Sequence, residues 1–109
     1  MSLSHAEVLG IIRNYIALVR AAGVPVSEVH LFGSRARGKE HDWSDIDLCI
    51  VSAAFGKDYS EEMSLLLMLT TKMDSPVPIE PIPFAPGDLS EKYSTLASEI
   101  RKYGKRVAV

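Results

Sequence analysis

One face of residues 4–22 is apolar. Its apolar side chains recur at three- and four-residue intervals: Val8, Ile11, Ile12, Tyr15, Val19 and Ala22. This spacing predicts an amphipathic helix. Ser4 and Glu7 have the spacing of a capping box at the start of that helix, and Gly23 followed by Pro25 predicts its end.

Two further helices are predicted in the second half of the chain. Residues 60–73 follow the N-cap candidate Asp58 and are crowded with apolar side chains: Leu65, Leu66, Leu67, Met68 and Leu69. So wide an apolar surface predicts burial against a sheet or, as the alternative, a face that binds a partner. Asp88 with Glu91 has the spacing of the start of a last helix, and Gly104 marks its end.

Three short segments are predicted to be strands. Residues 29–32 are an apolar run ended by Gly33, and residues 46–51 are a second run. Residues 75–89 predict a third strand, which must be irregular or lie at the edge of the sheet because three of its residues cannot donate to a ladder: Pro78, Pro81 and Pro83. The order helix, strand, strand, helix, strand, helix predicts a small α/β or α+β fold.

The size and composition of the chain limit its function. Its 109 residues suffice for one domain, residues 1–109, and are too few for a catalytic domain plus a large substrate-binding domain. A formal net charge of -2 gives no general attraction to nucleic acid, which is therefore not an expected partner. One cysteine, no long apolar run and no signal-peptide core predict a cytoplasmic protein without a membrane segment.

Gly33, Gly38 and Lys39 have the spacing of a Walker A loop, G-x-x-x-x-G-K. Two features argue against such a loop. The residue after the lysine is Glu40 rather than the serine or threonine that binds magnesium, and residues 39–45 lack the apolar periodicity of a following helix.

Asp45 and Asp47 are the first candidates for chemistry. They stand at the start of the predicted strand 46–51, so both carboxylates are expected on one face while the alternate apolar residues enter the core. Two residues of strand span about 6.6 Å, across which two carboxylates can hold a pair of divalent cations for phosphoryl chemistry. Taken alone, the pair is more typical of solvated turn residues.

The loop before the two aspartates favours the chemical interpretation. Gly33 allows a ligand to approach the backbone closely, and Ser34 can begin a short helical turn whose free N–H groups face an anion. Arg35 and Arg37 add positive charge and point to different sides of such a turn, so one of them is expected to reach phosphate. A nucleoside triphosphate with its metal would neutralise the repelling aspartates.

Gly33 and Ser34, ten further residues and then Asp45 and Asp47 resemble the signature of the DNA polymerase beta superfamily. The segments FGSRARG and SDIDL are similar to those of the minimal nucleotidyltransferases of bacteria and archaea. This resemblance implies a nucleotidyltransferase fold, a small mixed β-sheet with helices packed on one side. It also implies transfer of a nucleoside monophosphate, AMP in the first place, from ATP or another NTP to a hydroxyl group.

The resemblance extends to the site residues. Asp45 and Asp47 would bind two Mg²⁺ ions, and Gly33 with Ser34 would contact the triphosphate. A third carboxylate of the family comes from a later strand, where it binds metal and helps to deprotonate the acceptor. Glu80, within PIEPIPF, takes this position, although the family more often carries Asp there.

Minimal nucleotidyltransferases often accompany a helical protein of the HEPN class as toxin–antitoxin pairs, in which the enzyme adenylylates a tyrosine of the toxin. The resemblance therefore implies an antitoxin that acts on a HEPN-type partner, with homo- or hetero-oligomers both open. Two alternatives remain. One is a non-catalytic antitoxin that occludes its partner, and the other is a transferase acting on an aminoglycoside or similar small molecule.

Overall fold

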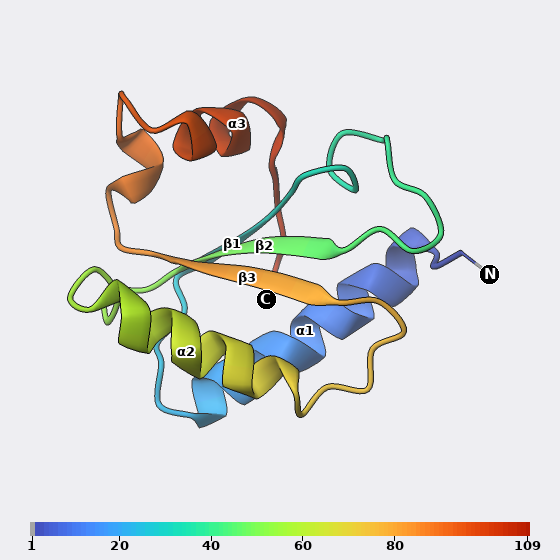
Figure 1. Cartoon of the computed structure of the whole chain (residues 1–109), viewed down its shortest axis with the longest axis horizontal. Coiled ribbons are helices and arrows are strands. Elements are labelled where there is room, and N and C mark those ends of the chain that lie inside the picture. The colour runs from blue at the N-terminus through green and yellow to red at the C-terminus, as the bar shows by residue number, and fades with distance from the viewer. Residues whose placement is uncertain (1) are drawn as a thin grey trace.

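A computed structural model describes residues 2–109 as a four-stranded sheet with three α-helices (Figure 1). The elements follow in the order α1 (His5–Ala21), β1 (Glu28–Phe32), β2 (Ile46–Val51), α2 (Tyr59–Thr70), β3 (Ile79–Phe84), the 3-10 helix η1 (Asp88–Ser90), α3 (Thr95–Tyr103) and β4 (Lys105–Arg106). The predicted mixed α/β fold is confirmed. None of the helices in residues 2–109 is long and apolar enough to span a bilayer.

The strands lie in the order β3-β2-β1-β4. β1 is antiparallel to both β2 and β4, whereas β2 and β3 are parallel. A parallel pair needs a long crossover connection, and α2 supplies it here. The sheet is therefore mixed, and β2 lies between β1 and β3 at its centre.

The helices cover both faces of the sheet (Figure 1). α1 and α2 lie against one face and share with it the larger hydrophobic core, which includes Ile12, Leu48 and Leu66. α3 lies over the opposite face, where Ile100 packs in a smaller cluster with Cys49. The expectation of helices on one side is met by α1 and α2 only.

The starts of α1 and α2 agree with the sequence signals. Ser4 Oγ accepts a hydrogen bond from the backbone N–H of Glu7 at 3.1 Å, and the Glu7 carboxylate accepts one from the backbone N–H of Ser4 at 2.9 Å. Asp58 caps α2 by accepting from the backbone N–H of Glu61. The predicted capping box and the N-cap of α2 are confirmed.

The predicted start of the last helix at Asp88 is wrong, because α3 begins later in the chain. Asp88 begins η1 and its carboxylate accepts from the backbone N–H of Ala85 at 2.7 Å. α3 begins at Thr95, and its N-cap is Ser94, which accepts from the N–H of Ala97. Aspartate and serine are both good N-cap residues, so the sequence offered two starts for this helix.

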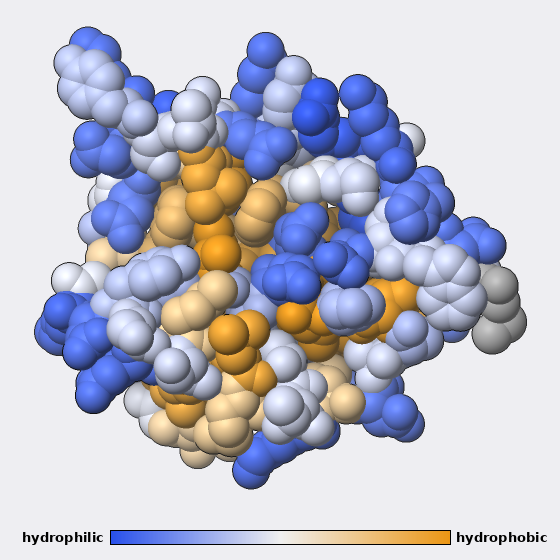
Figure 2. Space-filling view, viewed as in Figure 1, coloured by the Kyte–Doolittle hydropathy of each residue, from blue (hydrophilic) through white to orange (hydrophobic). Residues whose placement is uncertain are grey.

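α2 buries only part of its apolar surface. Leu66 and Leu69 are buried, but Leu67 is 44% and Met68 47% exposed. Apolar side chains gather on the face of the molecule where α2 lies (Figure 2). Burial against the sheet thus accounts for one side of this helix and leaves another side open.

β3 is an edge strand, as its prolines predicted. The carbonyls of Pro78 and Phe84 accept hydrogen bonds from the N–H groups of β2 and its flanks, so even-numbered residues of β3 direct their backbone groups toward β2. The backbone groups of Pro81 and Pro83 then face the open edge, where a proline nitrogen has no hydrogen to donate. Little of this edge can pair with another strand.

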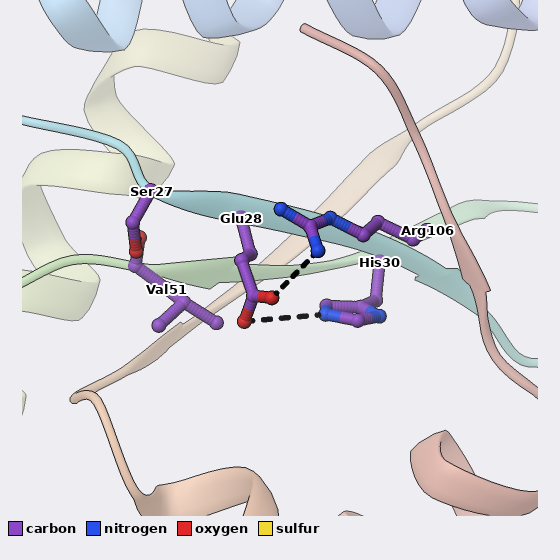
Figure 3. A network of polar contacts seen from close by, with 5 residues as sticks. All are labelled: Ser27, Glu28, His30, Val51 and Arg106. Atoms are coloured by element: carbon purple, nitrogen blue, oxygen red, sulfur yellow. Dashed lines mark hydrogen bonds and ion pairs between the residues drawn. The ribbon is translucent and has the colours of Figure 1, made fainter.

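β4 closes the other side of the sheet and was not predicted. His30 and Leu31 of β1 pair with it, and Arg106 forms an ion pair with Glu28 at 3.1 Å (Figure 3). The second carboxylate oxygen of Glu28 is 3.8 Å from Nε2 of His30. Because β4 follows α3 almost directly, these contacts fix the end of α3 over the sheet.

Candidate active site

Three carboxylates come together at one end of β2 and β3. Asp47 and Glu80 are Cα partners in the parallel register, and Asp45 immediately precedes β2. Side chains of paired residues in adjacent strands project from the same face. That face is the one with α3, because Asp47 shares the parity of Cys49, which packs beneath Ile100.

Gly33, directly after β1, lies against the carboxylate of Asp47. A β-carbon built on Gly33 would be 2.1 Å from Oδ2 of Asp47, a distance that no real contact reaches. The backbone φ of Gly33 is 73°, in the left-handed region that favours glycine. Glycine is thus required here for two reasons, its conformation and the approach of Asp47.

The charges around Asp47 are not balanced by the protein. Burial, followed by the negative charges of Asp45, Glu80 and Glu99, raises the pKa of Asp47 to about 6. Each of these causes disfavours the ionised form. A bound cation would reverse their effect, since it would stabilise the carboxylate that the neighbours destabilise.

Residues 34–38 form a turn between Gly33 and the aspartates. The backbone N–H groups of Ala36 and Arg37 bond to the carbonyl of Gly33, and that of Lys39 bonds to Ser34 at 2.9 Å. The amides of Ser34 and Arg35 come before the first of these bonds, as the leading amides of a helical turn do. They are the backbone donors with which this turn can meet an anion.

The side chain of Arg35 forms hydrogen bonds within the loop that connects β1 and β2. Its Nε and Nη2 both donate to the carbonyl of Ser44, at 3.0 and 2.8 Å. Ser44 is 5% exposed, and its Oγ accepts from the backbone N–H of His41. Arg35 therefore ties the start of the loop to the residue before Asp45.

Arg37 points toward α3 instead. Its guanidinium lies 4.3 Å from the centroid of the Tyr103 ring and 3.9 Å from the carboxylate of Glu99. Its side chain is 33% exposed. A single long ion pair at the surface contributes little, so this guanidinium can change partners more easily than that of Arg35.

Glu99 and Tyr103 were not among the site residues predicted from the sequence. Both lie in α3, at positions that ordinary helix surface residues occupy, and only the packing of α3 over the sheet brings Glu99 close to Asp47. The 3.6-residue periodicity identified the helix without indicating that its exposed side would face a site.

The carboxylates suit magnesium in their chemistry. Mg²⁺ takes oxygen ligands and is commonly held by one or two carboxylates together with substrate phosphates. Within residues 2–109, no three His, Cys, Asp or Glu side chains are arranged to hold a metal ion by themselves. Asp45 and Asp47 thus fit a metal whose remaining ligands come from a nucleotide.

The chain matches a family model for the nucleotidyltransferase domain over residues 13–106. It belongs to that family. The matched residues include the turn after β1 and all three carboxylates, and the chain is a nucleotidyltransferase. No curated protein sequence matches this nucleotidyltransferase significantly.

Solved structures agree with this assignment. A crystal structure of a toxin-antitoxin with AMP-PNP is 25% identical with a TM-score of 0.56, and the match covers 87% of this nucleotidyltransferase and 71% of that chain. A mutant of the toxin-antitoxin MntA-HpeT is 25% identical with a TM-score of 0.58, covering 89% and 71%. A Sulfolobus solfataricus protein described as a nucleotidyltransferase, at 24% identity and a TM-score of 0.59 over 76% and 71%, supports the fold alone.

Proposed function

We propose that this nucleotidyltransferase is an antitoxin that moves a nucleoside monophosphate, AMP in the first place, from an NTP to a hydroxyl group of a partner protein. The observation that carries the proposal is the pairing of Asp47 with Glu80 on adjacent strands, beside the turn that begins at Gly33. That arrangement offers oxygen ligands, an anion-binding turn and a second carboxylate in one place.

The triphosphate would lie along the turn that follows β1. The free amides at Ser34 and Arg35 donate to phosphate oxygens. Of the two arginines, Arg37 is the one we assign to phosphate, because the guanidinium of Arg35 already makes two bonds to the Ser44 carbonyl. Arg37 would exchange its long ion pair with Glu99 for a shorter bidentate contact.

The reaction is an in-line displacement at the α-phosphorus. The hydroxyl oxygen of the acceptor forms the new P–O bond, the bond to the bridging oxygen of the β-phosphate breaks, and pyrophosphate leaves. Glu80, exposed beside Asp47, accepts the hydroxyl proton as a general base.

Asp45 and Asp47 would hold the metal. When bound, Mg²⁺ supplies positive charge to the phosphate oxygens and polarises them. The raised pKa of Asp47 supports this role, because it reflects the burial of the carboxylate together with several negative charges beside it.

Two comparisons favour a protein partner. The solved relatives at 25% identity are toxin-antitoxin structures, one with AMP-PNP and one a mutant of MntA-HpeT. A toxin as acceptor follows from this likeness, and we propose a helical HEPN-type toxin on the resemblance of the sequence motifs.

The test is a transfer assay with the purified protein, magnesium, α-labelled ATP and the protein encoded next to it. We expect label on that protein together with pyrophosphate release. Asp47→Asn should remove both signals while the domain still folds. Transfer by Asp47→Asn at the wild-type rate would refute the assignment.

A second candidate function is occlusion, in which the antitoxin covers its partner without modifying it. The exposed apolar side of α2, with Leu67 and Met68, favours this candidate. The variants Asp45→Asn and Asp47→Asn separate the two functions. If both variants still neutralise the toxin, the result supports occlusion. If they no longer neutralise the toxin but still form the complex with it, the result supports transfer.

A further inference from the structure

A hollow of about 480 Å³ opens between the end of α2, the segment that follows it and the start of β3. Its walls include Leu67, Thr70, Met73, Val77 and Ile79, and Glu80 is also among its lining residues. The hollow therefore reaches the residue that pairs with Asp47 across the sheet. The hollow lies on the α2 side of the sheet, whereas the carboxylates project on the α3 side. Because β3 is the edge strand, a segment seated in the hollow can present a side chain to Glu80 around that edge.

We infer that this hollow is the docking site for the acceptor, and that its occupant is a hydroxyl-bearing segment of the partner protein with an apolar residue in the hollow and a basic residue beside it. The inference rests on the proposed transfer function and specifies how its acceptor is held.

The wall formed by α2 supports an apolar occupant. Leu67 is 44% exposed on the wall, and Met68, the next residue of α2, is 47% exposed and lies outside the lining. Isolated exposed apolar residues are normal on a protein surface, but a group of them beside a cavity marks an interaction site. In the space-filling view, apolar side chains gather over α2 and around β3 (Figure 2). The volume falls within the range of ligand pockets, about 300–1,000 Å³, so the hollow takes side chains rather than a whole helix.

The charges support a basic flank. Glu80 is the charged residue of the lining, and none of the described residues that line the hollow is lysine or arginine. Asp47 is the Cα partner of Glu80 in the neighbouring strand, and Asp45 directly precedes that strand. A cationic residue next to the acceptor hydroxyl complements this surface.

The edge of β3 limits how the segment can lie. The prolines at positions 81 and 83 remove two outward donors, so Ile79 is the outward-facing residue of β3 that keeps its N–H. Ile79 also lines the hollow. An extended segment can thus pair with the sheet at the hollow and not further along β3.

The test compares Leu67→Glu and Leu67→Lys with Tyr59→Glu and Tyr59→Lys. Tyr59 is 61% exposed at the other end of α2 and does not line the hollow, so its variants are matched controls. Three quantities are measured: the Kd of the chain for AMP-PNP with magnesium, the Kd of the complex with the protein encoded next to it, and the KM of that protein as acceptor.

We expect both Leu67 variants to raise the complex Kd and the acceptor KM at least tenfold without changing the Kd for AMP-PNP. Leu67→Lys should raise both constants several-fold more than Leu67→Glu, because the new lysine also repels the basic residue of the partner. The Tyr59 variants should match the wild type. Equal increases in the complex Kd for Leu67→Lys and Leu67→Glu would refute the basic residue beside the hollow. A wild-type complex Kd and acceptor KM in both variants would refute the docking site.

The two proposals fail in different ways. Absence of label with every protein, the wild type included, refutes the transfer function, and the complex Kd still decides whether the partner occupies the hollow. A Leu67 variant that changes the self-association of the chain in sedimentation, but not the complex Kd, identifies a second copy as the occupant and overturns the inference.

Discussion

Gly33 lies so close to Asp47 that no side chain fits at position 33, because a β-carbon there would be 2.1 Å from Oδ2 of Asp47. Gly33→Ala should displace the carboxylate and reduce transfer about 100-fold or more, since a misplacement of about 1 Å in an active site has that effect. The initial rate of label transfer measures the loss.

Gly38→Ala is the matched control for that variant. Gly38 has a φ of 69°, close to the 73° of Gly33, but a β-carbon there meets no atom within 4 Å. Both variants should lose about 1 kcal/mol of stability from the left-handed conformation, and Gly33→Ala should lose more because its β-carbon also meets the carboxylate of Asp47. Equal losses of activity in the two would show that backbone strain, and not contact with Asp47, matters at Gly33.

The raised pKa of Asp47 predicts how stability depends on pH in the absence of magnesium. The pKa is about 6 in the folded protein and about 3.9 in an unfolded chain, so the folded state holds this proton more tightly. The resulting stabilisation is complete below about pH 4 and is lost as the pH rises through 6. Because Asp47 is partly exposed, we expect an effect on the order of 1 kcal/mol.

Asp47→Asn should therefore melt at a higher temperature than the wild type at pH 7 and at a similar temperature at pH 4. Magnesium with AMP-PNP should raise the wild-type Tm at pH 7 above that of Asp47→Asn. Asp74→Asn, an exposed position outside the site, serves as the control in the same thermal melts. A difference between Asp47→Asn and wild type that does not vary with pH would contradict the prediction.

Glu80→Gln removes the proposed base while keeping the size of the side chain. We expect the transfer rate to fall about 100- to 10,000-fold, the usual contribution of general acid–base catalysis, with the Kd for AMP-PNP nearly unchanged. Glu80→Asp, which restores the carboxylate that the family more often carries, should recover part of the rate. Wild-type kcat in Glu80→Gln would exclude Glu80 as the base.

The two arginines of the turn should respond differently to mutation. Arg35→Ala removes two hydrogen bonds to the Ser44 carbonyl and should lower the Tm. Arg37→Ala removes a cation–π contact with Tyr103 and a long ion pair with Glu99, so its Tm should change little. Its Kd for AMP-PNP should rise about tenfold. The opposite result would assign phosphate binding to Arg35.

The sequence predicted the elements of the centre of the fold well. The second strand was predicted at residues 46–51, where β2 lies, because this short run is apolar apart from Asp47, as expected for a strand buried on both faces. The capping signals of α1 and α2 are local and were interpreted correctly. These features depend on neighbours within four residues of each other.

The remaining features depend on contacts between distant segments. β4 is two residues long and is held by pairing with His30 and Leu31 rather than by any pattern of its own. α3 lies on the face of the sheet opposite α1 and α2 because Ile100 packs against Cys49 there, and this packing brings Glu99 near Asp47. Asp45 and Asp47 could be named from their spacing and Glu80 from the resemblance, whereas the pairing of Glu80 with Asp47 required the register of β2 and β3.

The parallel pairing of β2 with β3 has a consequence for how the protein acquires its site. Asp47 and Glu80 meet only after the chain has passed through α2 and returned to the sheet, and such non-local strand pairing forms slowly. A ligand that needs both carboxylates has no binding site on a partly folded chain. Its binding energy is therefore added to the stability of the completed sheet, and the folded enzyme accumulates at the expense of its folding intermediates when that ligand is abundant.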